Sequence, residues 1–481
     1  MTQLLILVAI SPAHWTSACS SSPAVHHLRK TCRKPQSGWN KLASCIFRQS
    51  PDGEEMLKKL CTMLEENPHL ILDTNDFGTN QRIYYSTEDT IMKYPVLPGL
   101  TMDGQVYCNA EMGTVEAIIP PGSWRTCHGP GMAELPNGDL LCCWFAGTFE
   151  GDADIHIVCA RLPKGADKWE EPVDVSKDPT RSEQNPSLFM GPDGAVWCMY
   201  TAQLGRIPGK DNMQYTAQVR CQKSFDGGKT WGDFETIFPE EGTFSRQPIQ
   251  ILKNGRWIYG NWICTDAVDG LAVDPSAFRI SDDQGKTWRM VMMPKSSGRV
   301  HANVVELDNG HLVAFMRSRE ADFIYRSESF DWGDSWSQPV PTVLPNNNSS
   351  ISAIRTQSGR IAIAYNPTSV PEDMRSKCAW PGLRCPVAIA LSEDGGLTFP
   401  MIRWMERGEG YIGDENKTNN KQYEYPCLMQ SADGRLHLTY AAFTRKAVKY
   451  ISCTEEDIMG AKRERYGVYN PTNGEGARDA Q

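Results

Sequence analysis

The chain has 481 residues, with 49 Lys and Arg against 58 Asp and Glu, so its formal net charge at neutral pH is −9. An acidic chain without long basic runs is not expected to bind nucleic acid or an anionic membrane as its main partner. Apolar residues make up 40% of the chain and include 14 Trp, which excludes a wholly disordered protein. Because no uninterrupted apolar stretch approaches the length that crosses a bilayer, we expect no membrane span.

Residues 1–50 are expected to form a poorly ordered leader. The apolar run 4–10 and Thr16-Ser17-Ala18-Cys19 are similar to parts of a secretion signal, but Met1-Thr2-Gln3 lacks the usual basic residues. The 16 cysteines form neither a short-spaced disulfide framework nor paired Cys-x-x-Cys zinc elements, and many lie inside apolar runs. Buried thiols favour a reducing compartment, so the location stays open between a cytoplasmic protein, slightly favoured, and a secreted one. We expect neither a cofactor nor a metal.

A helix is predicted over residues 54–66. Met56, Leu57, Leu60, Met63 and Leu64 share one face, Ser50-Pro51 precedes the segment, and Asn67-Pro68 ends it. Residues 51–114 are therefore expected to form a helical extension and a linker.

From about residue 115 the pattern changes to short apolar strands that flank an Asn-Gly, Asp-Gly or Ser-Gly turn. The glycines are Gly138, Gly194, Gly255, Gly310, Gly359 and Gly434. These dipeptides supply the positive φ angles of tight turns, so each copy predicts a hairpin of two antiparallel strands.

A second unit, Ser-x-Asp-x-Gly-x-Thr/Ser-aromatic, falls between the hairpins. It occurs at 224–231, 281–288, 329–336 and 392–399, and a degenerate copy ends at Trp169. Two hairpins per repeat give four strands, and six repeats predict radial closure. The expected fold is all-β, a six-bladed β-propeller over 115–455 with a short N-terminal helical extension and a tail at 456–481.

The second unit resembles the Asp-box of the sialidase (neuraminidase) superfamily. The resemblance covers about residues 115–455 and implies a propeller with a site at the mouth of its channel. It says less about chemistry, since Asp-boxes lie in outer turns and also occur in propellers without enzymatic activity.

Polar residues precede each hairpin or end its second strand, where the inner strands should converge. The candidates for substrate binding are Arg125, His128, Asn185, Arg246, His301, Arg317, Arg319 and Asn347. Arginines bind carboxylates through bidentate, charge-assisted bonds. Such a cluster in an acidic chain predicts a site for an acidic glycan or oligosaccharide.

The resemblance also implies catalytic roles. Tyr423-Glu424-Tyr425 is similar to the nucleophile segment of sialidases, with Tyr425 or Tyr423 as nucleophile and Glu424 as its base, although Pro426 stands where Ser is usual. Glu150 and Asp152 lie in a stretch similar to the one that carries the acid/base Asp. These likenesses imply an exo-acting, retaining hydrolase that releases a terminal acidic sugar such as sialic acid.

Two departures keep alternatives open. The Arg-Ile-Pro of sialidases precedes the first blade, whereas the copy here begins at Arg206, after the second hairpin, and we interpret it as a coincidental loop. His128 and His301 are not part of the sialidase machinery. A lyase of the same fold, with a His or Tyr base acting on a uronate, and a non-catalytic glycan-binding propeller are the alternatives.

Overall fold

The computed structural model describes residues 6–7, 81–82, 101–109, 112–210, 212–266, 270–381, 383–408 and 422–460. The chain divides into two units, residues 1–90 and 91–481. In the first unit, strands β1 (Ile6–Leu7) and β2 (Gln81–Arg82) pair antiparallel. The leader over residues 1–50 and the helix predicted over 54–66 otherwise lie outside the described residues.

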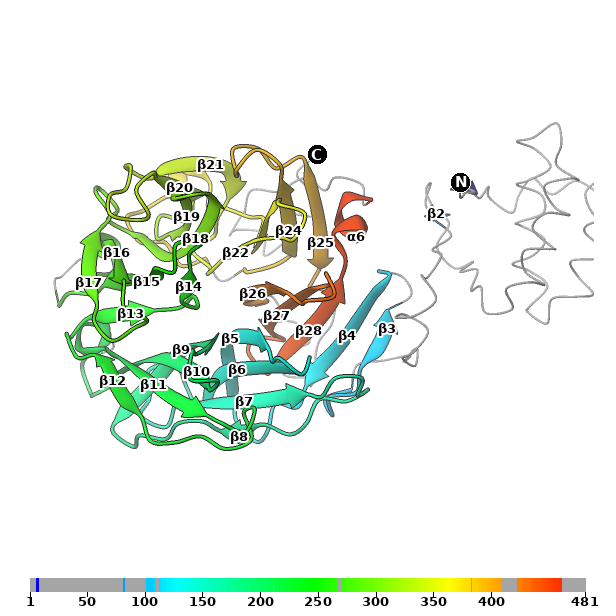
Figure 1. Ribbon diagram of the computed structural model, residues 1–481, viewed down its shortest axis with the longest axis horizontal. Helices are drawn as coiled ribbons and strands as arrows, with labels where there is room; N and C mark the ends of the chain where they lie inside the picture. The colour runs from blue at the N-terminus through cyan, green and yellow to red at the C-terminus, as the bar shows by residue number, and fades with distance from the viewer. Residues whose placement is uncertain are drawn as a thin grey trace, which may run out of the picture. The chain divides into compact units, whose positions relative to one another are not determined.

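The second unit is a ring of six antiparallel sheets, which confirms the predicted six-bladed β-propeller (Figure 1). Blade 1 contains β5 (Thr126–Glu134), β6 (Leu140–Gly147), β7 (His156–Leu162) and β8 (Val173–Asp174). Blade 2 contains β9 (Arg181–Met190), β10 (Val196–Leu204), β11 (Gln218–Ser224) and β12 (Glu235–Phe238). Blade 3 contains β13 (Thr243–Ser245), β14 (Gln250–Ile251), β15 (Trp257–Ile263), β16 (Ser276–Ser281) and β17 (Arg289–Met292). Blade 4 contains β18 (Arg299–Asp308), β19 (His311–Ser318), β20 (Phe323–Ser329) and β21 (Val340–Pro345). Blade 5 contains β22 (Ser352–Arg355), β23 (Ile361–Tyr365), β24 (Val387–Ser392) and β25 (Met401–Glu406).

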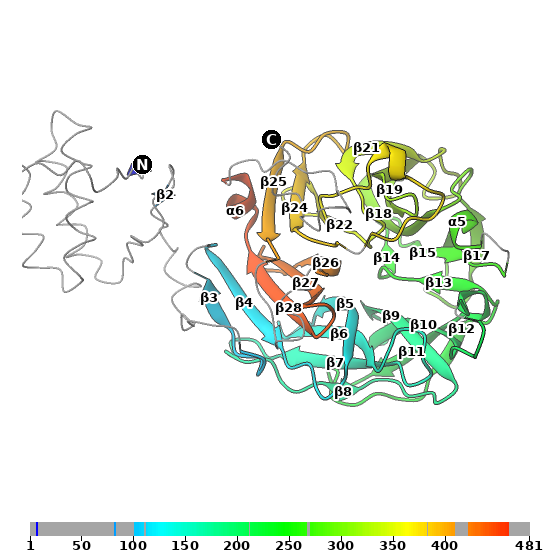
Figure 2. The same cartoon turned by 180° about the vertical axis from the view of Figure 1, so that it is seen from behind.

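Blade 6 is built from both ends of the propeller segment and closes the ring. Its strands are β26 (Glu424–Gln430), β27 (Leu436–Ala442), β28 (Ala447–Cys453), β4 (Thr114–Ile119) and β3 (Tyr107–Asn109). The early strand β4 pairs antiparallel with the late strand β28, and the two lie side by side from either side of the ring (Figures 1 and 2). The chain thus has no open edge at the junction of its first and last strands.

The helical elements of the described residues are short. They are α5 (Gly270–Val273), α6 (Glu455–Met459) and the 3-10 turns η3 (Gln214–Thr216) and η4 (Glu372–Met374). No helix in the described part of the chain is long and apolar enough to cross a membrane.

The repeated turns form as their sequences predict. All six hairpin glycines have positive φ, between 77° at Gly194 and 90° at Gly359. In the Asp-box at 281–288, Ser281 Oγ accepts from the amide of Gly285 at 2.7 Å, and Asp283 accepts from the amide and hydroxyl of Thr287 at 2.9 and 2.6 Å. The bonds from Thr287 lower the pKa of Asp283 to about 2. The Asp-box hydrogen bonds therefore stabilise an outer turn, and the site is formed by the inner strands.

Apolar cores lie between neighbouring blades. The core between blades 1 and 2 includes Cys143, Cys159 and Cys198 beside Phe145 and Tyr200. These cysteines are buried, as predicted from their place in apolar runs. The blades are thereby held by side-chain packing as well as by strand pairing.

Candidate functional site

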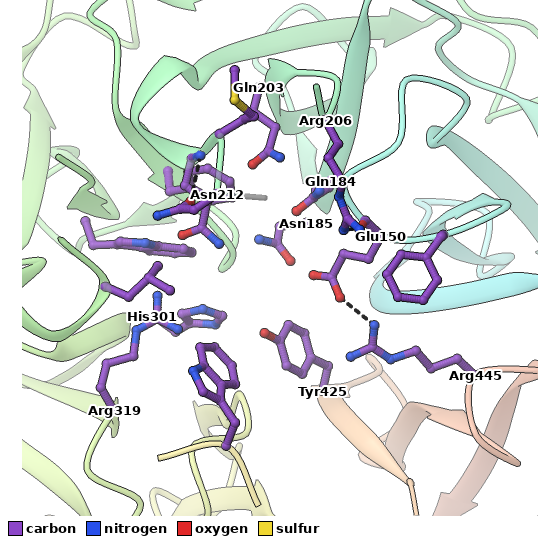
Figure 3. Close-up of a pocket in the computed structure, with 18 of the residues that line it drawn as sticks. Glu150, Gln184, Asn185, Gln203, Arg206, Asn212, His301, Arg319, Tyr425 and Arg445 are labelled. Carbon is purple, nitrogen blue, oxygen red and sulfur yellow. Dashed lines mark hydrogen bonds and ion pairs between the residues drawn. The ribbon is translucent and has the colours of Figure 1, made fainter. Parts of the chain in front are cut away.

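A cavity of about 360 Å³ opens where the inner ends of the blades converge, and all six blades contribute to its wall (Figure 3). Its polar lining residues are Glu150, Gln184, Asn185, Gln203, Arg206, Asn212, Gln214, His301, Arg319, Arg384, Tyr425 and Arg445. Aromatic rings from Phe149, Phe244, Trp262 and Trp380 complete much of the wall. A concave surface with converging polar groups and aromatic rings is typical of a small-molecule site.

A β-bulge on the inner strand directs side chains to this cavity in several blades. Registers shift on β5, β9, β18 and β26, each of which carries one extra residue against its partner strand. The first residue of the bulge is Gly129, Asn185, His301 or Tyr425, with φ of 62°, 52°, 58° and 55°. Such left-handed backbone costs about 1–3 kcal/mol for a residue other than glycine and is concentrated at functional sites.

The bulge also accounts for Pro426. Proline is the second bulge residue in three of these four strands, as Pro130, Pro186 and Pro426. A bulge tolerates proline because its residues need not donate to the strand ladder. The proline that replaces the usual Ser is therefore compatible with the backbone that presents Tyr425.

Tyr425 lies at the centre of the site, with its hydroxyl directed into the cavity (Figure 3). The phenolic oxygen accepts a hydrogen bond from Nη1 of Arg317 at 2.7 Å. Its ring packs against two imidazoles, with centroids 4.2 Å from His128 and 5.6 Å from His301. Burial, followed by the charges of nearby arginines, lowers the pKa of both histidines well below the usual value, so both are neutral at physiological pH.

A chain of alternating charges lies beside Tyr425. Glu424 is fully buried between Arg384 and Arg445, and its Oε1 lies 2.5 Å from Nε of Arg445. Arg445 also pairs with Glu150 at the cavity wall. Burial alone would raise the pKa of Glu424, but the charges of Arg384 and Arg445 lower it below the usual range. Glu424 is therefore ionised and held by cations, and its hydrogen bonds do not go to the Tyr425 hydroxyl.

The cavity wall is cationic. It includes four arginines, Arg206, Arg319, Arg384 and Arg445, against the single carboxylate of Glu150. Arg319 is the least satisfied of them: its Nη2 lies 3.6 Å from Asp274, and its buried Nε has no hydrogen-bond partner among the described residues. An excess of positive charge in a chain of net charge −9 favours an anionic ligand.

The structure brings five of the candidates predicted from sequence to the cavity wall. They are Glu150, Asn185, His301, Arg319 and Tyr425. His128, Arg317 and Glu424 lie buried behind the wall and contact Tyr425 or the arginines that line it. These three can act on a ligand through their neighbours.

The remaining five candidates lie elsewhere. Tyr423 is buried in the apolar core of blades 5 and 6, and Arg125 is exposed on the segment before β5. Asn347 donates to the hydroxyl of Thr368 and the carbonyl of Leu383. The next residue, Asn348, faces Arg317 instead.

Arg246 and Asp152 complete this group. Arg246 is buried and donates to the carbonyls of Pro130, Pro186 and Tyr425, so it ties three inner strands together. Asp152 lies 3.9 Å from Arg206 and is not among the lining residues.

Sequence reasoning missed several cavity residues. The interpretation of Arg206 as part of a coincidental loop is not supported by its position, because its guanidinium lies at the wall and donates to the carbonyl of Glu150 at 2.6 Å. The Arg-Ile-Pro triplet was the signal that could have identified it. Arg384 and Trp380 lie in the long connection between β23 and β24, where no repeat or motif marks them.

The propeller segment of the sequence matches a known family. Residues 138–438, more than half of the chain, match the profile of the BNR repeat-like domain family. The chain belongs to this family. No curated protein matches the chain.

Solved structures similar to this BNR repeat-like protein include sialidases. One is the Hadza microbial sialidase Hz136, with 16% identity and a TM-score of 0.58, where the match covers 70% of this chain and 68% of that chain. Another is the NanB sialidase from Streptococcus pneumoniae, with 13% identity and a TM-score of 0.54, where the match covers 78% of this chain and 73% of that chain. A leech intramolecular trans-sialidase is also similar, with 14% identity and a TM-score of 0.54, and the match covers 70% of this chain and 69% of that chain. At these identities the likeness shows a shared fold, a sialidase-like propeller.

Proposed function

We propose that this protein is a sialidase-like glycoside hydrolase that releases a terminal acidic sugar from a glycan with retention of configuration. The observation that carries the proposal is the hydroxyl of Tyr425, which faces a cationic cavity and accepts a hydrogen bond from a buried guanidinium. A tyrosine nucleophile suits a sugar that bears a carboxylate at the reacting carbon, because a carboxylate nucleophile would be repelled.

The roles follow from the position of each side chain. Arg319 and Arg384 would bind the carboxylate of the sugar. Tyr425 would attack the anomeric carbon while Arg317 stabilises the charge that develops as its proton passes to water in the cavity. Glu150, once its ion pair with Arg445 opens and it takes up a proton, would protonate the departing glycosidic oxygen. It would then take a proton from the water that hydrolyses the glycosyl–tyrosine intermediate.

This assignment differs from the sequence-based prediction in two respects. Glu150 is preferred to Asp152 as acid/base because Glu150 lines the cavity. Glu424 is no longer assigned as the base of the nucleophile, since its carboxylate is bound by Arg384 and Arg445.

The surroundings of Tyr425 favour an elimination as the second candidate. No carboxylate of the described residues hydrogen-bonds to its hydroxyl, and two neutral imidazoles pack on its ring. In a lyase, Tyr425 as the phenolate would take the C5 proton of a uronate, and the electron pair would form the C4–C5 double bond. The C4 oxygen would leave with that proton, donated back by Tyr425. Arg319 would neutralise the carboxylate.

Product analysis on a panel of sialylated and uronate-containing glycans tests both. Hydrolysis releases a saturated sugar whose initial anomer, followed by NMR, reports retention, whereas elimination gives an unsaturated uronate that absorbs in the near ultraviolet. Tyr425→Phe should lower turnover at least about 1,000-fold. Tyr423→Phe, a change in the core, is the matched control and should remain active. Binding without turnover across the whole panel would contradict both enzymatic proposals and favour a glycan-binding propeller.

A further inference from the structure

Arg317 is held by an unusual set of partners for a buried cation. One hydrogen of Nη1 goes to the Tyr425 oxygen at 2.7 Å, and Nη1 also lies 3.3 Å from Nε2 of His301. Nε and Nη2 both donate to Oδ1 of Asn348, at 3.0 and 2.5 Å. The side chain is fully buried, and none of the described carboxylates forms an ion pair with it. Its orientation therefore depends on neutral acceptors.

These contacts fix the tautomer of His301. A guanidinium has only donors, so Nε2 of His301 must be the acceptor of the bond from Arg317. The proton of the neutral ring then lies on Nδ1, which donates to Oγ of Ser350 at 2.9 Å. The Ser350 hydroxyl can in turn donate to the carbonyl of Ile351 at 3.5 Å. Ser350 thus accepts the Nδ1 proton in the tautomer that the bond from Arg317 requires.

The ring of His301 is also fixed in position. It stacks on the indole of Trp262, with centroids 4.3 Å apart and planes 16° from parallel. Its backbone is in the left-handed region of the β18 bulge, and the residue is buried. The charges that act most strongly on it are those of Arg317, Arg319, Arg246 and Arg384, which together with burial lower its pKa well below the usual value and keep it neutral.

We propose that His301 is a positioning residue: as a neutral acceptor whose Nδ1 proton is bound by Ser350, it holds the Arg317 guanidinium against the oxygen of Tyr425. A buried cation without a carboxylate partner gains its counter-ion when Tyr425 loses its proton. Fixing that cation at the phenolic oxygen makes the tyrosine a nucleophile or base without a neighbouring carboxylate. The catalytic consequence rests on the proposed function, but the Ser350–His301–Arg317–Tyr425 chain can be tested without it.

Spectroscopic titration tests the chain in the absence of any substrate. The phenolate absorption of Tyr425 is obtained as the difference between the full-length protein and Tyr425→Phe, each titrated with base. In His301→Leu this signal should appear about one pH unit higher than in the unchanged protein, since the guanidinium loses an acceptor that holds it in place. In His301→Gln, whose amide oxygen can accept from Arg317, the signal should return toward the original pH. Ser350→Ala should shift it in the same direction as His301→Leu, but less.

His311 provides the matched control. It lies on β19, the strand that also carries Arg317, but bonds to Glu328 on the neighbouring strand. His311→Leu should leave the phenolate signal unchanged. Identical titrations for His301→Leu, His301→Gln and the unchanged protein would overturn the proposal, as would a shift of equal size in His311→Leu.

Kinetics add a second readout once a substrate is identified. His301→Leu should lower kcat about 100-fold with KM changed by less than about threefold, and His301→Gln should recover most of the loss. A change in KM alone would show that His301 contacts substrate instead, contrary to the proposal. If no glycan is turned over, the proposed function fails while the titration still decides the role of His301. Melting temperatures of all variants establish that each is folded, and His301→Gln keeps the test open if His301→Leu does not fold.

Discussion

The hydroxyl of Tyr425 on blade 6 accepts a hydrogen bond of 2.7 Å from Arg317 on β19, the second strand of blade 4. Glu424, the preceding residue, has different partners, namely Arg384 and Arg445. Two neighbours in sequence thus belong to two separate electrostatic systems. The cation beside the tyrosine lacks a carboxylate among the described residues, whereas the glutamate is held by two cations, so their substitutions should have different consequences.

Glu424→Gln is expected to destabilise the fold. The change leaves Arg384 and Arg445 without their shared buried anion, and removing one partner of a buried ion pair costs about 3–5 kcal/mol. The free energy of unfolding, measured by urea denaturation near neutral pH, should fall by that order.

Glu150→Gln is the matched change in the same chain of charges. Its side chain is 34% exposed. The loss of stability should therefore be below about 1 kcal/mol, as for partly exposed ion pairs. Turnover should fall about 100-fold or more because Glu150 is the proposed acid/base. Full activity in Glu150→Gln would refute that role, and an unchanged stability in Glu424→Gln would refute the structural one.

Arg319→Ala tests the carboxylate site. Its unpartnered Nε and its place at the wall make it the arginine with most capacity left for a ligand. We expect kcat/KM for an acidic substrate to fall about 100-fold, as for the loss of a charge-assisted contact. The melting temperature should fall as well, because the buried carboxylate of Asp274 loses its partner. Arg125→Ala, at an exposed position, is the control and should stay within about twofold. Equal losses in both variants would mean that the effect reports overall charge, not binding at the wall.

Arg246→Ala should affect stability before activity. The guanidinium donates to the carbonyls of Pro130, Pro186 and Tyr425, and no described side chain replaces it. Each buried carbonyl left unpaired costs about 1–3 kcal/mol, so we expect the free energy of unfolding to fall by about 3 kcal/mol. Urea denaturation provides the measurement. A variant as stable as the unchanged protein but inactive would instead assign Arg246 to the substrate.

The fold was predictable because its signals are local. Asn-Gly and Asp-Gly turns and the Ser-x-Asp-x-Gly pattern each determine one turn, and their repetition determines the ring. The same locality identified Tyr425 and His301, which occupy equivalent bulges on β26 and β18.

The parts of the site that sequence reasoning missed depend on geometry that short patterns do not encode. Asn348, whose backbone has a left-handed φ of 56°, faces Arg317, and Asn347 does not. Arg384 reaches the site from a long connection without a repeat. Arg125 precedes β5 and Arg246 lies between β13 and β14. Strand periodicity does not give the direction of side chains outside the strands, so it could not show that Arg246 is buried and Arg125 exposed.

Buried neutral histidines should make the fold sensitive to acid. His437 is hydrogen-bonded to Tyr450 at 2.9 Å and to Ser431 at 2.8 Å, and burial lowers its pKa to about 4. In the unfolded chain the pKa of a histidine is about 6.5, so between about pH 6.5 and 4 the unfolded state binds a proton that the folded state does not. The stability that His437 contributes is therefore complete above about pH 6.5 and is lost as the pH falls toward 4, by about 3 kcal/mol in all.

His437→Gln isolates this effect, because Gln cannot take up the proton. The variant should be less stable at pH 7, where it loses packing and hydrogen bonds. Its deficit relative to the unchanged protein should shrink, and could reverse, between about pH 7 and 4, because only the unchanged protein loses stability through this residue. Urea denaturation at several pH values measures the difference in the free energy of unfolding between the two proteins. The contributions of the carboxylates, which both proteins share, cancel in this difference. A deficit that stays constant with pH would mean that His437 takes up its proton at the same pH in the folded and unfolded states, contrary to its burial and its two hydrogen bonds.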